Sequence, residues 1–553
     1  MQKFRSPLFI FSFSHVIGFS QNSSLGFSFP LDRNPVVTGN YAELRPNHFH
    51  AGLDFSTDPV ANLPIKCVAD GYVSRIKISS GGYGRVLYVT HTNGYVTVYA
   101  HQKKYADKLA AYTRQKQIEQ KKNEIELFPA PGELPVKKGE VIGYTGNTGS
   151  STGPHLHFEI REEKSEIPLN PLLFYDVKDD VKPVVTHIAV YNTADTNAVV
   201  LQNSAALDPK SNSLQLPGNT FVLPQNTFAL AFSGYDLTNG TSNKNNIYEA
   251  RIELDGRLIY HHQLNNISFD QARYVNVFSE KKGSVKFQKC FTPQCYDVTL
   301  YKTVVRGGKI ELKDTLRHTV KLTVADEKGN QQALSFYVKA RQIKGYTAEA
   351  TRNNAFCAKD FVLKQAEFDM FVPKGTLANN TLIFKRTFVK MPANGPLEIG
   401  NKNEKLLKAF QMAIKIPEPL KGKESKLVML VNGDAVTAAY DNGWLRAEPK
   451  AFGNFYYAYD TVAPLISYGY NKTKPAVIKG YKNLAFKVSD DLSGIGDYHL
   501  YINNTWQVAE YDAKSSTIFC YFDENTPSGN IDIRLEVTDR VGNKASFEWK
   551  TLR

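Results

Sequence analysis

The stretch HLHFEI, residues 155–160, alternates polar and apolar side chains at every step. Because successive side chains of a β-strand point to opposite faces, Leu156, Phe158 and Ile160 are expected in a core, with both histidines on the other face. The Cα atoms of the two histidines would then be about 7 Å apart. One histidine can bind a metal ion while the other reaches a bound water or a substrate.

A second stretch, HAGLD at residues 50–54, follows the same logic. Gly52 discourages a helix here, and in an extended chain His50 and Asp54 share a face. A nitrogen ligand and a carboxylate ligand therefore point into one cavity.

A third stretch, YVTVYAH at residues 95–101, also reads as a strand. Its small apolar residues, Val96, Val98 and Ala100, are expected on the core face. This leaves His101 at the end of the opposite face, as a third functional candidate.

The chemistry that such residues support is metal-assisted hydrolysis. A Zn²⁺ ion with three protein ligands and one open position activates water and stabilises a developing oxyanion. Two histidines and one aspartate are suitable ligands, and further histidines can act as general base and oxyanion partner. No HExxH motif occurs in the sequence, so thermolysin-like zinc chemistry is not supported.

The motifs FHAGLDF, VADGYV, GGYGRVLYVTH, YVTVYAHQ and VKKGEVIGYTGNTGSSTGPHLHFEIR follow one another within residues 45–161. In this order they resemble the lysostaphin-like (LytM-type) family of zinc peptidoglycan endopeptidases. The resemblance implies a compact antiparallel β domain in which zinc is the cofactor and three residues are its ligands: His50, Asp54 and His157. It makes His101 and His155 the catalytic histidines. All five residues are retained, which favours an active enzyme over degenerate members that regulate other wall hydrolases.

The rest of the chain is expected to be mainly β. We expect a signal peptide at 1–20, where Lys3 and Arg5 precede an apolar run, and a peptidase domain at 22–178. Within this domain, Tyr105, Leu109 and Tyr112 recur at helical spacing and predict a helical insertion at about 102–138.

Beyond residue 178 the sequence contains an internal repeat. VKPVVTHIAVYN, SGYDLTNG and VADEKGN are echoed by VAPLISYGYNK, VSDDLSGIGDYHLYINN and VTDRVGN. Two immunoglobulin-like β-sandwiches, at 180–343 and 460–553, are the simplest account. A β-rich domain of unknown fold lies between them at 344–459. The Asp and Asn residues of the repeat suggest either Ca²⁺ sites or tight turns, and the absence of EF-hand spacing favours turns.

Cysteine spacing gives limited information. Cys290 and Cys295 could close a small disulfide loop or remain two thiols, whereas Cys67, Cys357 and Cys520 are expected as buried thiols.

The net charge of +13 favours a polyanionic partner such as nucleic acid, an anionic membrane or an anionic wall polymer. Because the sequence has neither a paired CxxC finger nor a basic recognition helix, no nucleic-acid partner is expected. No stretch after the leader approaches the ~18–20 apolar residues of a membrane span, so no stable membrane insertion is expected.

The leading hypothesis is a secreted or periplasmic metallo-endopeptidase that acts on the peptide stems and cross-links of peptidoglycan in the cell envelope. The leader, and the lack of a Gram-positive wall-targeting module, favour a Gram-negative envelope and a D,D-type cross-link. One alternative is a catalytically silent zinc-binding scaffold that activates a cell wall amidase. Another gives the main role to the C-terminal β-sandwiches, as an adhesin or a wall-polysaccharide binder.

Overall fold

The computed structural model describes most of the chain after the predicted signal peptide, which lies outside the described residues. The described ranges are 26–33, 36–57, 62–175, 177–193, 200–239, 241–343, 355–381, 383, 396–416, 420–470 and 474–553. Within them, 44 strands accompany two α-helices, which confirms the expected mainly β architecture. We refer to residues 26–175, 177–343, 355–459 and 460–553 as the first to fourth units.

The first unit is built on one large antiparallel sheet with the strand order β1-β4-β13-β8-β7-β6-β10. Its strands, in that order, are Val37–Gly39, Leu53–Ser56, His155–Glu162, Tyr95–Ala100, Arg85–His91, Gly71–Ile78 and Ile125–Leu127. β11 (Pro135–Val136) adds to β6, and β14 (Pro168–Leu169) adds to β13. A three-stranded sheet of β5 (Pro64–Lys66), β12 (Val141–Tyr144) and β9 (Lys104–Tyr105), and a ribbon of β2 (Leu44–Arg45) and β3 (His48–Phe49), complete this unit.

The core of the first unit lies on one face of the large sheet. Leu156, Phe158 and Ile160 of β13 belong to it and are completely buried, as the alternation predicts. The other face carries a smaller apolar cluster formed by Val86, Tyr88, Val96, Val98 and Ala100. Both faces of β8 are therefore covered.

The predicted helical insertion contains α1 (Asp107–Gln120). Its buried residues are Leu109, Thr113 and Gln117, which follow the i, i+4, i+8 spacing of one helical face. Tyr105, which we expected on this helix, belongs instead to β9 and hydrogen-bonds through its hydroxyl to the carbonyl oxygen of Lys77. The helix therefore begins later than the sequence pattern indicated.

The second unit packs two sheets around a shared core. The first sheet contains β17 (Ser213–Leu214), β16 (Val200–Asp208), β15 (Val184–Asn192), β19 (Thr227–Tyr235), β23 (Val285–Lys289) and β22 (Ser279–Lys282), with β25 (Ile310–Glu311) beside β19. The second contains β18 (Thr220–Leu223), β27 (Gln331–Ala340), β26 (His318–Ala325), β20 (Glu249–Leu254), β21 (Arg257–Gln263) and β24 (Tyr301–Val304). The short helix α2 (Val275–Phe278) precedes β22.

The third and fourth units are also pairs of sheets, each with its own core. The third pairs β28 (Phe361–Lys364), β29 (Phe368–Val372), β31 (Gln411–Lys415), β35 (Trp444–Ala447) and β34 (Ala438–Asp441) with β30 (Leu397–Ile399), β36 (Gly453–Tyr459), β32 (Leu427–Val431) and β33 (Asp434–Val436). The fourth pairs β37 (Leu465–Tyr468), β38 (Asn483–Ser489), β42 (Thr517–Tyr521) and β41 (Glu510–Asp512) with β40 (Thr505–Gln507), β39 (Ile495–Ile502), β43 (Asn530–Asp539) and β44 (Lys544–Leu552).

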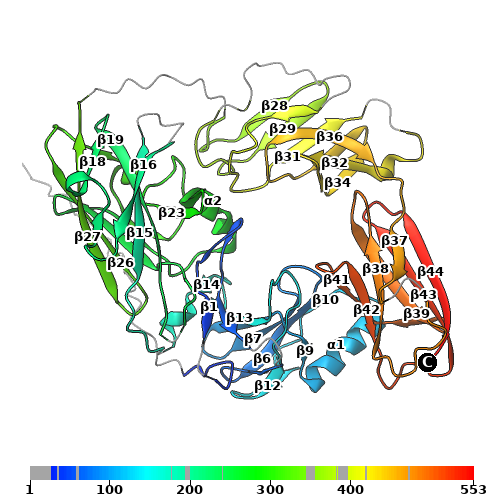
Figure 1. Cartoon of the computed structure of the whole chain (residues 1–553). Helices are drawn as coiled ribbons and strands as arrows, with labels where there is room; N and C mark the ends of the chain where they lie inside the picture. The colour runs from blue at the N-terminus through cyan, green and yellow to red at the C-terminus, as the bar shows by residue number, and fades with distance from the viewer. Residues whose placement is uncertain are drawn as a thin grey trace, which may run out of the picture.

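The four units follow one another around a circuit, and the fourth returns to the first beside α1 and β10 (Figure 1). Asn123 lies at this contact, where its amide nitrogen donates to the carbonyl oxygen of Tyr498 and its amide oxygen accepts from the backbone N–H of Ala509. Arg114 of α1 also pairs with Asp523, at 2.5 Å. The first and fourth units are therefore joined by the buried Asn123 and by a partly exposed ion pair.

The disulfide pairing differs from the sequence expectation. Cys295 is bonded to Cys357, which links the second unit to the third. Cys290 is a buried free thiol, so the small loop between Cys290 and Cys295 does not form. Cys357 is 62 residues from its partner and only the fold brings the two together. Cys67 and Cys520 are buried free thiols, as expected.

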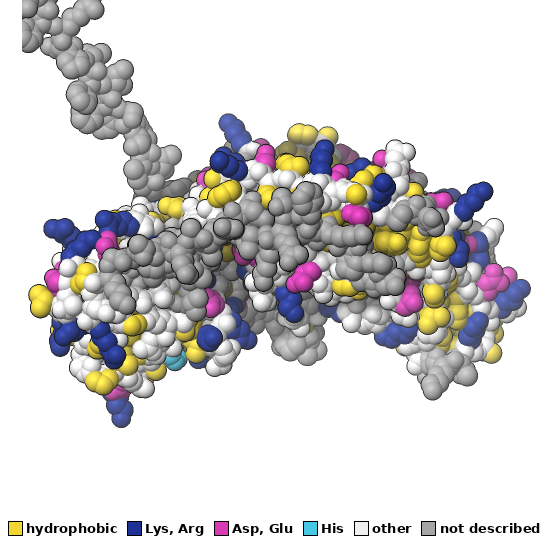
Figure 2. All heavy atoms as spheres, turned by 90° about the horizontal axis from the view of Figure 1, so that it is seen from above, with side chains coloured by type: hydrophobic (Ala, Val, Ile, Leu, Met, Phe, Trp, Pro, Cys, Tyr) yellow, Lys and Arg dark blue, Asp and Glu magenta, His cyan; other side chains and the backbone are white. Residues whose placement is uncertain are grey.

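Lys and Arg side chains are spread along the length of the face shown in Figure 2, with Asp and Glu among them. Among the described residues, no helix is both long enough and apolar enough to cross a membrane.

Candidate metal centre

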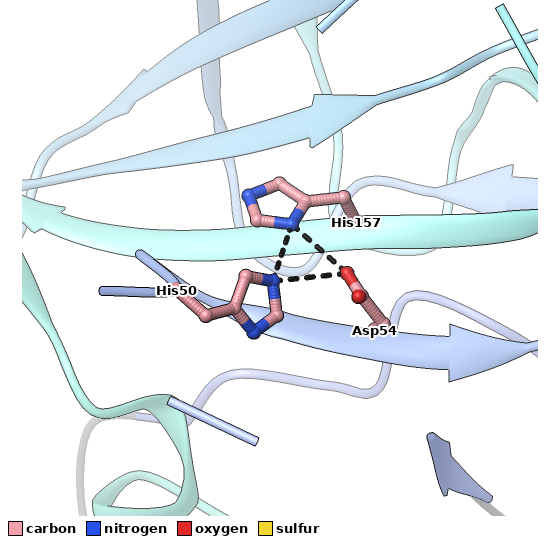
Figure 3. Close-up of side chains that lie close together, drawn as sticks. All are labelled: His50, Asp54 and His157. Carbon is pink, nitrogen blue, oxygen red and sulfur yellow. Dashed lines mark hydrogen bonds and ion pairs between the residues drawn. The ribbon is translucent and has the colours of Figure 1, made fainter. Parts of the chain in front are cut away.

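Three side chains that the sequence singled out meet in the first unit (Figure 3). The Nε2 atom of His50 lies 2.9 Å from Nδ1 of His157 and 3.0 Å from Oδ1 of Asp54. The same Asp54 oxygen lies 3.0 Å from Nδ1 of His157. All three residues are at least 94% buried, with exposed fractions of 2, 6 and 3% for His50, Asp54 and His157. Three such donor atoms could hold a metal ion.

Strand register creates this cluster. On β13, His157 lies directly opposite Asp54 of β4, and residues opposite each other in an antiparallel pair share a face. Gly52 is needed just before β4 because a Cβ atom there would lie 2.2 Å from the carbonyl oxygen of Phe158. The glycine therefore lets the His50 segment run close against β13.

In His50 and His157, one ring nitrogen faces away from the cluster and contacts an oxygen that can only accept a hydrogen bond. We call this the outer nitrogen, and the nitrogen that faces the cluster the inner nitrogen. Nδ1 of His50 donates to the carbonyl oxygen of Asn40 at 2.7 Å, and Nε2 of His157 donates to the Glu159 carboxylate at 2.7 Å. Each inner nitrogen therefore presents a lone pair to the cluster when its ring is neutral. Two nitrogen lone pairs and a carboxylate oxygen around 3 Å apart repel one another unless a cation lies between them.

A proton can take the place of that cation. Burial lowers the pKa of His157, but its hydrogen bonds with Asp54 and Glu159 outweigh this effect and raise the pKa to about 9. Since metal ligands must be deprotonated, a metal ion that binds here would displace this proton.

Glu159 is one of a row of interacting side chains that begins at His157. It is completely buried, accepts from Nε of Arg161 at 2.7 Å, and also accepts from the hydroxyl group of Tyr83. Burial alone would raise its pKa, but Arg161 and His157 lower it to about 2. The carboxylate is therefore ionised at neutral pH and holds the His157 ring in one orientation.

Arg45, at the end of β2, contacts the outer oxygen of Asp54. The Arg45 guanidinium also pairs with Glu43 at 2.9 Å. Burial raises the pKa of Asp54, but the neighbouring histidines, His50 first, hold it well below its usual value. One oxygen of Asp54 therefore faces the histidines while the other is neutralised by arginine.

The two predicted catalytic histidines lie beside the cluster. The rings of His101 and His155 are 4.7 Å apart between centroids, and His101 is 5.9 Å from His157. Nδ1 of His101 contacts the carbonyl oxygen of Thr148, and Nδ1 of His155 contacts that of Gly153, both at 2.8 Å. Since both carbonyl oxygens can only accept, both rings carry the proton on Nδ1.

The Nε2 atoms of these histidines can therefore act as bases. Nε2 of His155 is buried without a hydrogen-bond partner and lies 3.4 Å from Oδ1 of Asp54. Burial, together with the charges of His157 and His155, lowers the pKa of His101 to about 3. His101 is accordingly neutral at physiological pH.

The strand-face assignment for residues 95–101 was wrong. His157 pairs with Ala100, and Glu159 pairs with Val98, so these small apolar residues share the face of the site. Strict alternation would direct His101 to the opposite face, which is the core face. Its left-handed backbone (φ 58°) breaks the alternation and turns the ring towards the site.

Sequence reasoning missed four of the residues that support the site: Asn40, Arg45, Glu159 and Arg161. Glu159 and Arg161 follow His157 at period two on β13, so the alternation rule could have found them. Asn40 and Arg45 lie in short segments without a periodic pattern. His48, considered as a neighbour of the site, is exposed, and its Nδ1 atom lies 3.0 Å from the carbonyl oxygen of Pro46.

Comparison with known proteins matches this part of the chain. Residues 48–121 and 132–171 match the family model described as Peptidase family M23, which confirms the lysostaphin-like resemblance for these residues. The DD-carboxypeptidase/endopeptidase Mpg of Neisseria meningitidis serogroup B is 35% identical over 123 residues, which are 22% of this chain and 22% of the relative. The peptidoglycan DD-endopeptidase ShyC of Vibrio cholerae is 33% identical over 110 residues, 20% of this chain and 19% of the relative.

Among solved structures, the catalytic domain of lysostaphin from Staphylococcus simulans is 24% identical, with a TM-score of 0.20. That alignment covers 26% of this chain and 92% of the lysostaphin domain. The chain thus spans about a fifth of the length of the two curated relatives, Mpg and ShyC.

Proposed function

We propose that this protein is a zinc-dependent endopeptidase of the cell envelope that hydrolyses peptide cross-links of bacterial peptidoglycan. The observation that carries the proposal is the convergence of His50, Asp54 and His157, with His101 and His155 beside them. Similarity to Mpg and ShyC, over 22% and 20% of this chain, supports a substrate in the cell wall. These relatives are a DD-carboxypeptidase/endopeptidase and a peptidoglycan DD-endopeptidase, which favours a D,D-type cross-link.

The chemistry of the donor set fits zinc. Two imidazole nitrogens and one carboxylate oxygen form the ligand set of catalytic zinc sites, which keep a further position open for water or substrate. Softer copper or iron–sulfur chemistry would call for thiolate ligands, and Mg²⁺ or Ca²⁺ for oxygen ligands alone. A bound zinc ion supplies an activated water and polarises the scissile carbonyl group.

The protein residues around the donors hold them ready for this ion. Asn40 and Glu159 fix the proton of each ligating histidine on its outer nitrogen, which leaves the inner nitrogen free to bind. Arg45 compensates the outer oxygen of Asp54, so the carboxylate does not need a second cation. These contacts determine the orientation of the ligands before any ion arrives.

His101 and His155 are the proposed catalytic residues. His101 is neutral because burial lowers its pKa, so its Nε2 atom can accept the proton of the attacking water. That proton can then pass to the amine that leaves when the amide bond breaks. His155 presents Nε2 to the same space and, when protonated there, can donate to the oxyanion of the tetrahedral intermediate.

A cavity beside the site provides room for a polymeric substrate. It has a volume of about 540 Å³ and lies between the first and fourth units. Its lining includes Arg85, Thr148, Glu510 and Lys514, so it offers charges of both signs. Thr148 also accepts the hydrogen bond from His101, which places the cavity next to the catalytic histidines. We assign this cavity to a part of the peptide stem beyond the scissile bond.

The test compares the intact protein with His50→Ala and His155→Ala. Zinc content is measured by atomic absorption, and hydrolysis by the release of soluble peptides from purified peptidoglycan. We expect one zinc per chain, lost in His50→Ala but kept in His155→Ala, with peptide release abolished in both variants. Zinc binding without cleavage of any wall type would overturn the proposal and favour the amidase-activating scaffold.

A further inference from the structure

A group of three carboxylates, two of them buried, lies in the second unit, away from the donors of the metal centre. Asp179, Asp236 and Asp326 bring carboxylate oxygens within 4.8 Å of one another. A cavity of about 10 Å³ lies against them and is lined by Asp179 and Asp236 together with Asn40, Leu172, Val177, Thr238, Asn245, Glu327 and Lys328. This is about the space that one water molecule or one small ion occupies.

Two buried oxygens in this place have no hydrogen-bond donor. Oδ1 of Asp236 and Oδ1 of Asn245 are both without a partner, although both residues are only 4% exposed. Both residues line the cavity. Unpaired buried oxygens are costly, and an oxygen-preferring cation would satisfy both.

The charge balance also favours a cation. Four carboxyl groups, those of Asp179, Asp236, Asp326 and Glu327, gather near one ammonium group, that of Lys328. Lys328 directs its Nζ atom to the carbonyl oxygen of Tyr175 at 2.9 Å. Burial and the neighbouring carboxylates raise the pKa of Asp236 to about 8. Burial likewise raises the pKa of Glu327 to about 7. The group is therefore unfavourable in its ionised form unless positive charge is added.

The repeat contains the same arrangement a second time. In the second unit, the Asn330 amide donates to the Asp326 carboxylate and to the backbone carbonyl oxygen of Asp179, both at 2.8 Å. In the fourth unit, the Asn543 amide donates in the same way to Asp539 at 2.6 Å and to the carbonyl oxygen of Asp460 at 3.0 Å.

Each of these two groups has a third carboxylate, which is Asp236 in the second unit and Asp490 in the fourth unit. Both follow the end of a strand, β19 and β38 respectively. The sequence analysis favoured simple turns for these motifs, but a turn does not require three carboxylates in contact.

We propose that a Ca²⁺ ion binds among Asp179, Asp236 and Asp326, with the Asn245 amide oxygen as a further ligand. A set made only of oxygen atoms suits a hard cation, and Ca²⁺ accepts irregular oxygen cages more readily than Mg²⁺ does. This inference does not depend on the proposed peptidase function.

The bound ion would stabilise the contact between the first unit and the second. Asp179 lies at the start of the second unit, and Glu327 accepts a hydrogen bond from Asn170 of the first unit at 2.8 Å. Asn40, which also lines the cavity, holds His50 through its backbone carbonyl oxygen. The bound ion would therefore stabilise a junction that includes a residue supporting the metal centre.

The test is calorimetric titration of the zinc-loaded full chain with CaCl₂ and, separately, with MgCl₂. Asp236→Asn and Asp179→Asn each remove one proposed ligand charge with little change of shape. Asp180→Asn is the matched control, because this neighbouring carboxylate is 72% exposed. Asp460, Asp490 and Asp539 are unchanged in all variants, so any calcium they bind is common to all.

We expect both ligand variants to lose one calcium site, or to bind there about tenfold more weakly or worse, while Asp180→Asn behaves as the wild type. Calcium should raise the unfolding temperature of the wild type more than that of the ligand variants. If Asp236→Asn does not fold, Asp179→Asn decides, since its carboxylate is partly exposed. Equal calcium isotherms for wild type and Asp179→Asn would overturn the proposal, as would equal affinity for Mg²⁺.

Discussion

Glu159 shows how a single residue prepares the metal centre without touching the ion. Its carboxylate accepts from Nε2 of His157 at 2.7 Å and is itself held by Arg161. In Glu159→Gln the amide could turn its NH₂ group towards His157, which would favour the wrong protonated nitrogen. We expect zinc affinity to fall about 10–100-fold, measured by competition with a chelator.

Glu163→Gln is the control for this change, because Glu163 is near Glu159 in the sequence but its side chain is exposed. It should leave zinc affinity unchanged. Equal zinc affinity in Glu159→Gln and wild type would show that this carboxylate does not orient His157.

At this scale the sequence motifs singled out four histidines and one aspartate, and the structure brings these side chains close together, while their roles stay predictions. The sequence did not predict how His101 reaches the site. That depends on the left-handed backbone at His101, which interrupts the alternation used to place it. Arg45 was missed because its contact with Asp54 depends on the path of β2, a strand of two residues.

The pairing of β4 with β13 is the element on which the site depends. Gly52→Ala would place a Cβ atom 2.2 Å from the Phe158 carbonyl oxygen, so the two segments would have to separate. We expect the variant to lose about 1–3 kcal/mol of stability and to retain less zinc. Thermal unfolding and zinc content measure the two effects.

Gly81→Ala is the matched substitution in the same unit. A Cβ atom there would meet only Oγ of Ser150, at 3.9 Å, so neither stability nor zinc content should change appreciably. Full zinc content in Gly52→Ala would contradict the role given to this close approach.

Strand β21 carries a buried histidine that should make the second unit sensitive to acid. His262 is completely buried, and burial lowers its pKa to about 3. The unfolded chain binds a proton near pH 6.5 and the folded chain does not, so stability falls as pH drops below 6.5. Between pH 6.5 and 5 this residue should remove about 2 kcal/mol.

His262→Asn removes the titrating group and keeps a polar side chain that can hydrogen-bond the Tyr260 hydroxyl, which lies 3.0 Å from Nδ1 of His262. Urea unfolding at several pH values should therefore show a shallower decline between pH 6.5 and 5 in the variant. Parallel curves for variant and wild type would contradict the assignment.

The strands and the helix of the first unit were not predicted equally well from the sequence. The strands of the first unit follow from clear alternation, and the helix was expected at roughly the right place. The predicted start of the helix was wrong. Tyr105 is at helical spacing from Leu109, but it belongs to β9, which pairs with β12. The disulfide was missed because Cys295 and Cys357 are distant in sequence and come from different units.

The whole molecule is a circuit of four units, closed where the fourth meets the first (Figure 1). Lys514 of the fourth unit donates to the carbonyl oxygens of Asn147 and Ser151. These residues flank Thr148, which accepts from His101, and Ser151 lies 3.2 Å from Nδ1 of His155. The fourth unit is therefore in contact with the loop that orients both catalytic histidines.

Asn123 is the residue through which this closure can be tested. It is 6% exposed, and Asn123→Ala would leave the Tyr498 carbonyl group and the Ala509 N–H group without their partner. Each unpaired buried group costs about 1–3 kcal/mol. We expect faster hydrogen exchange in residues 498–511 and a larger radius of gyration in solution.

Asn530→Ala provides the comparison, since Asn530 is an exposed asparagine of the fourth unit. It should change neither quantity. If Asn123→Ala also leaves exchange and size unchanged, the contact between the first and fourth units does not hold the circuit closed.

At the scale of the molecule, the sequence repeat predicts two copies of one β-sandwich module in the second and fourth units. Both units contain a similar Asn-to-Asp contact, while the shared module stays a prediction. The third unit could not be named from its sequence because its strands carry no recognised motif. The closed circuit could not be predicted, since it depends on contacts between residues nearly 400 positions apart, such as Asn123 and Ala509.

The most direct test of the central claim is mass spectrometry of the soluble products released from purified peptidoglycan by the zinc-loaded full chain. We expect cross-linked dimers to become monomers with one new free amine and one new carboxyl group, with intact glycan strands and no release after chelation of zinc. Products with cleaved sugars, or glycan strands stripped of their whole stem peptides, would contradict the endopeptidase assignment.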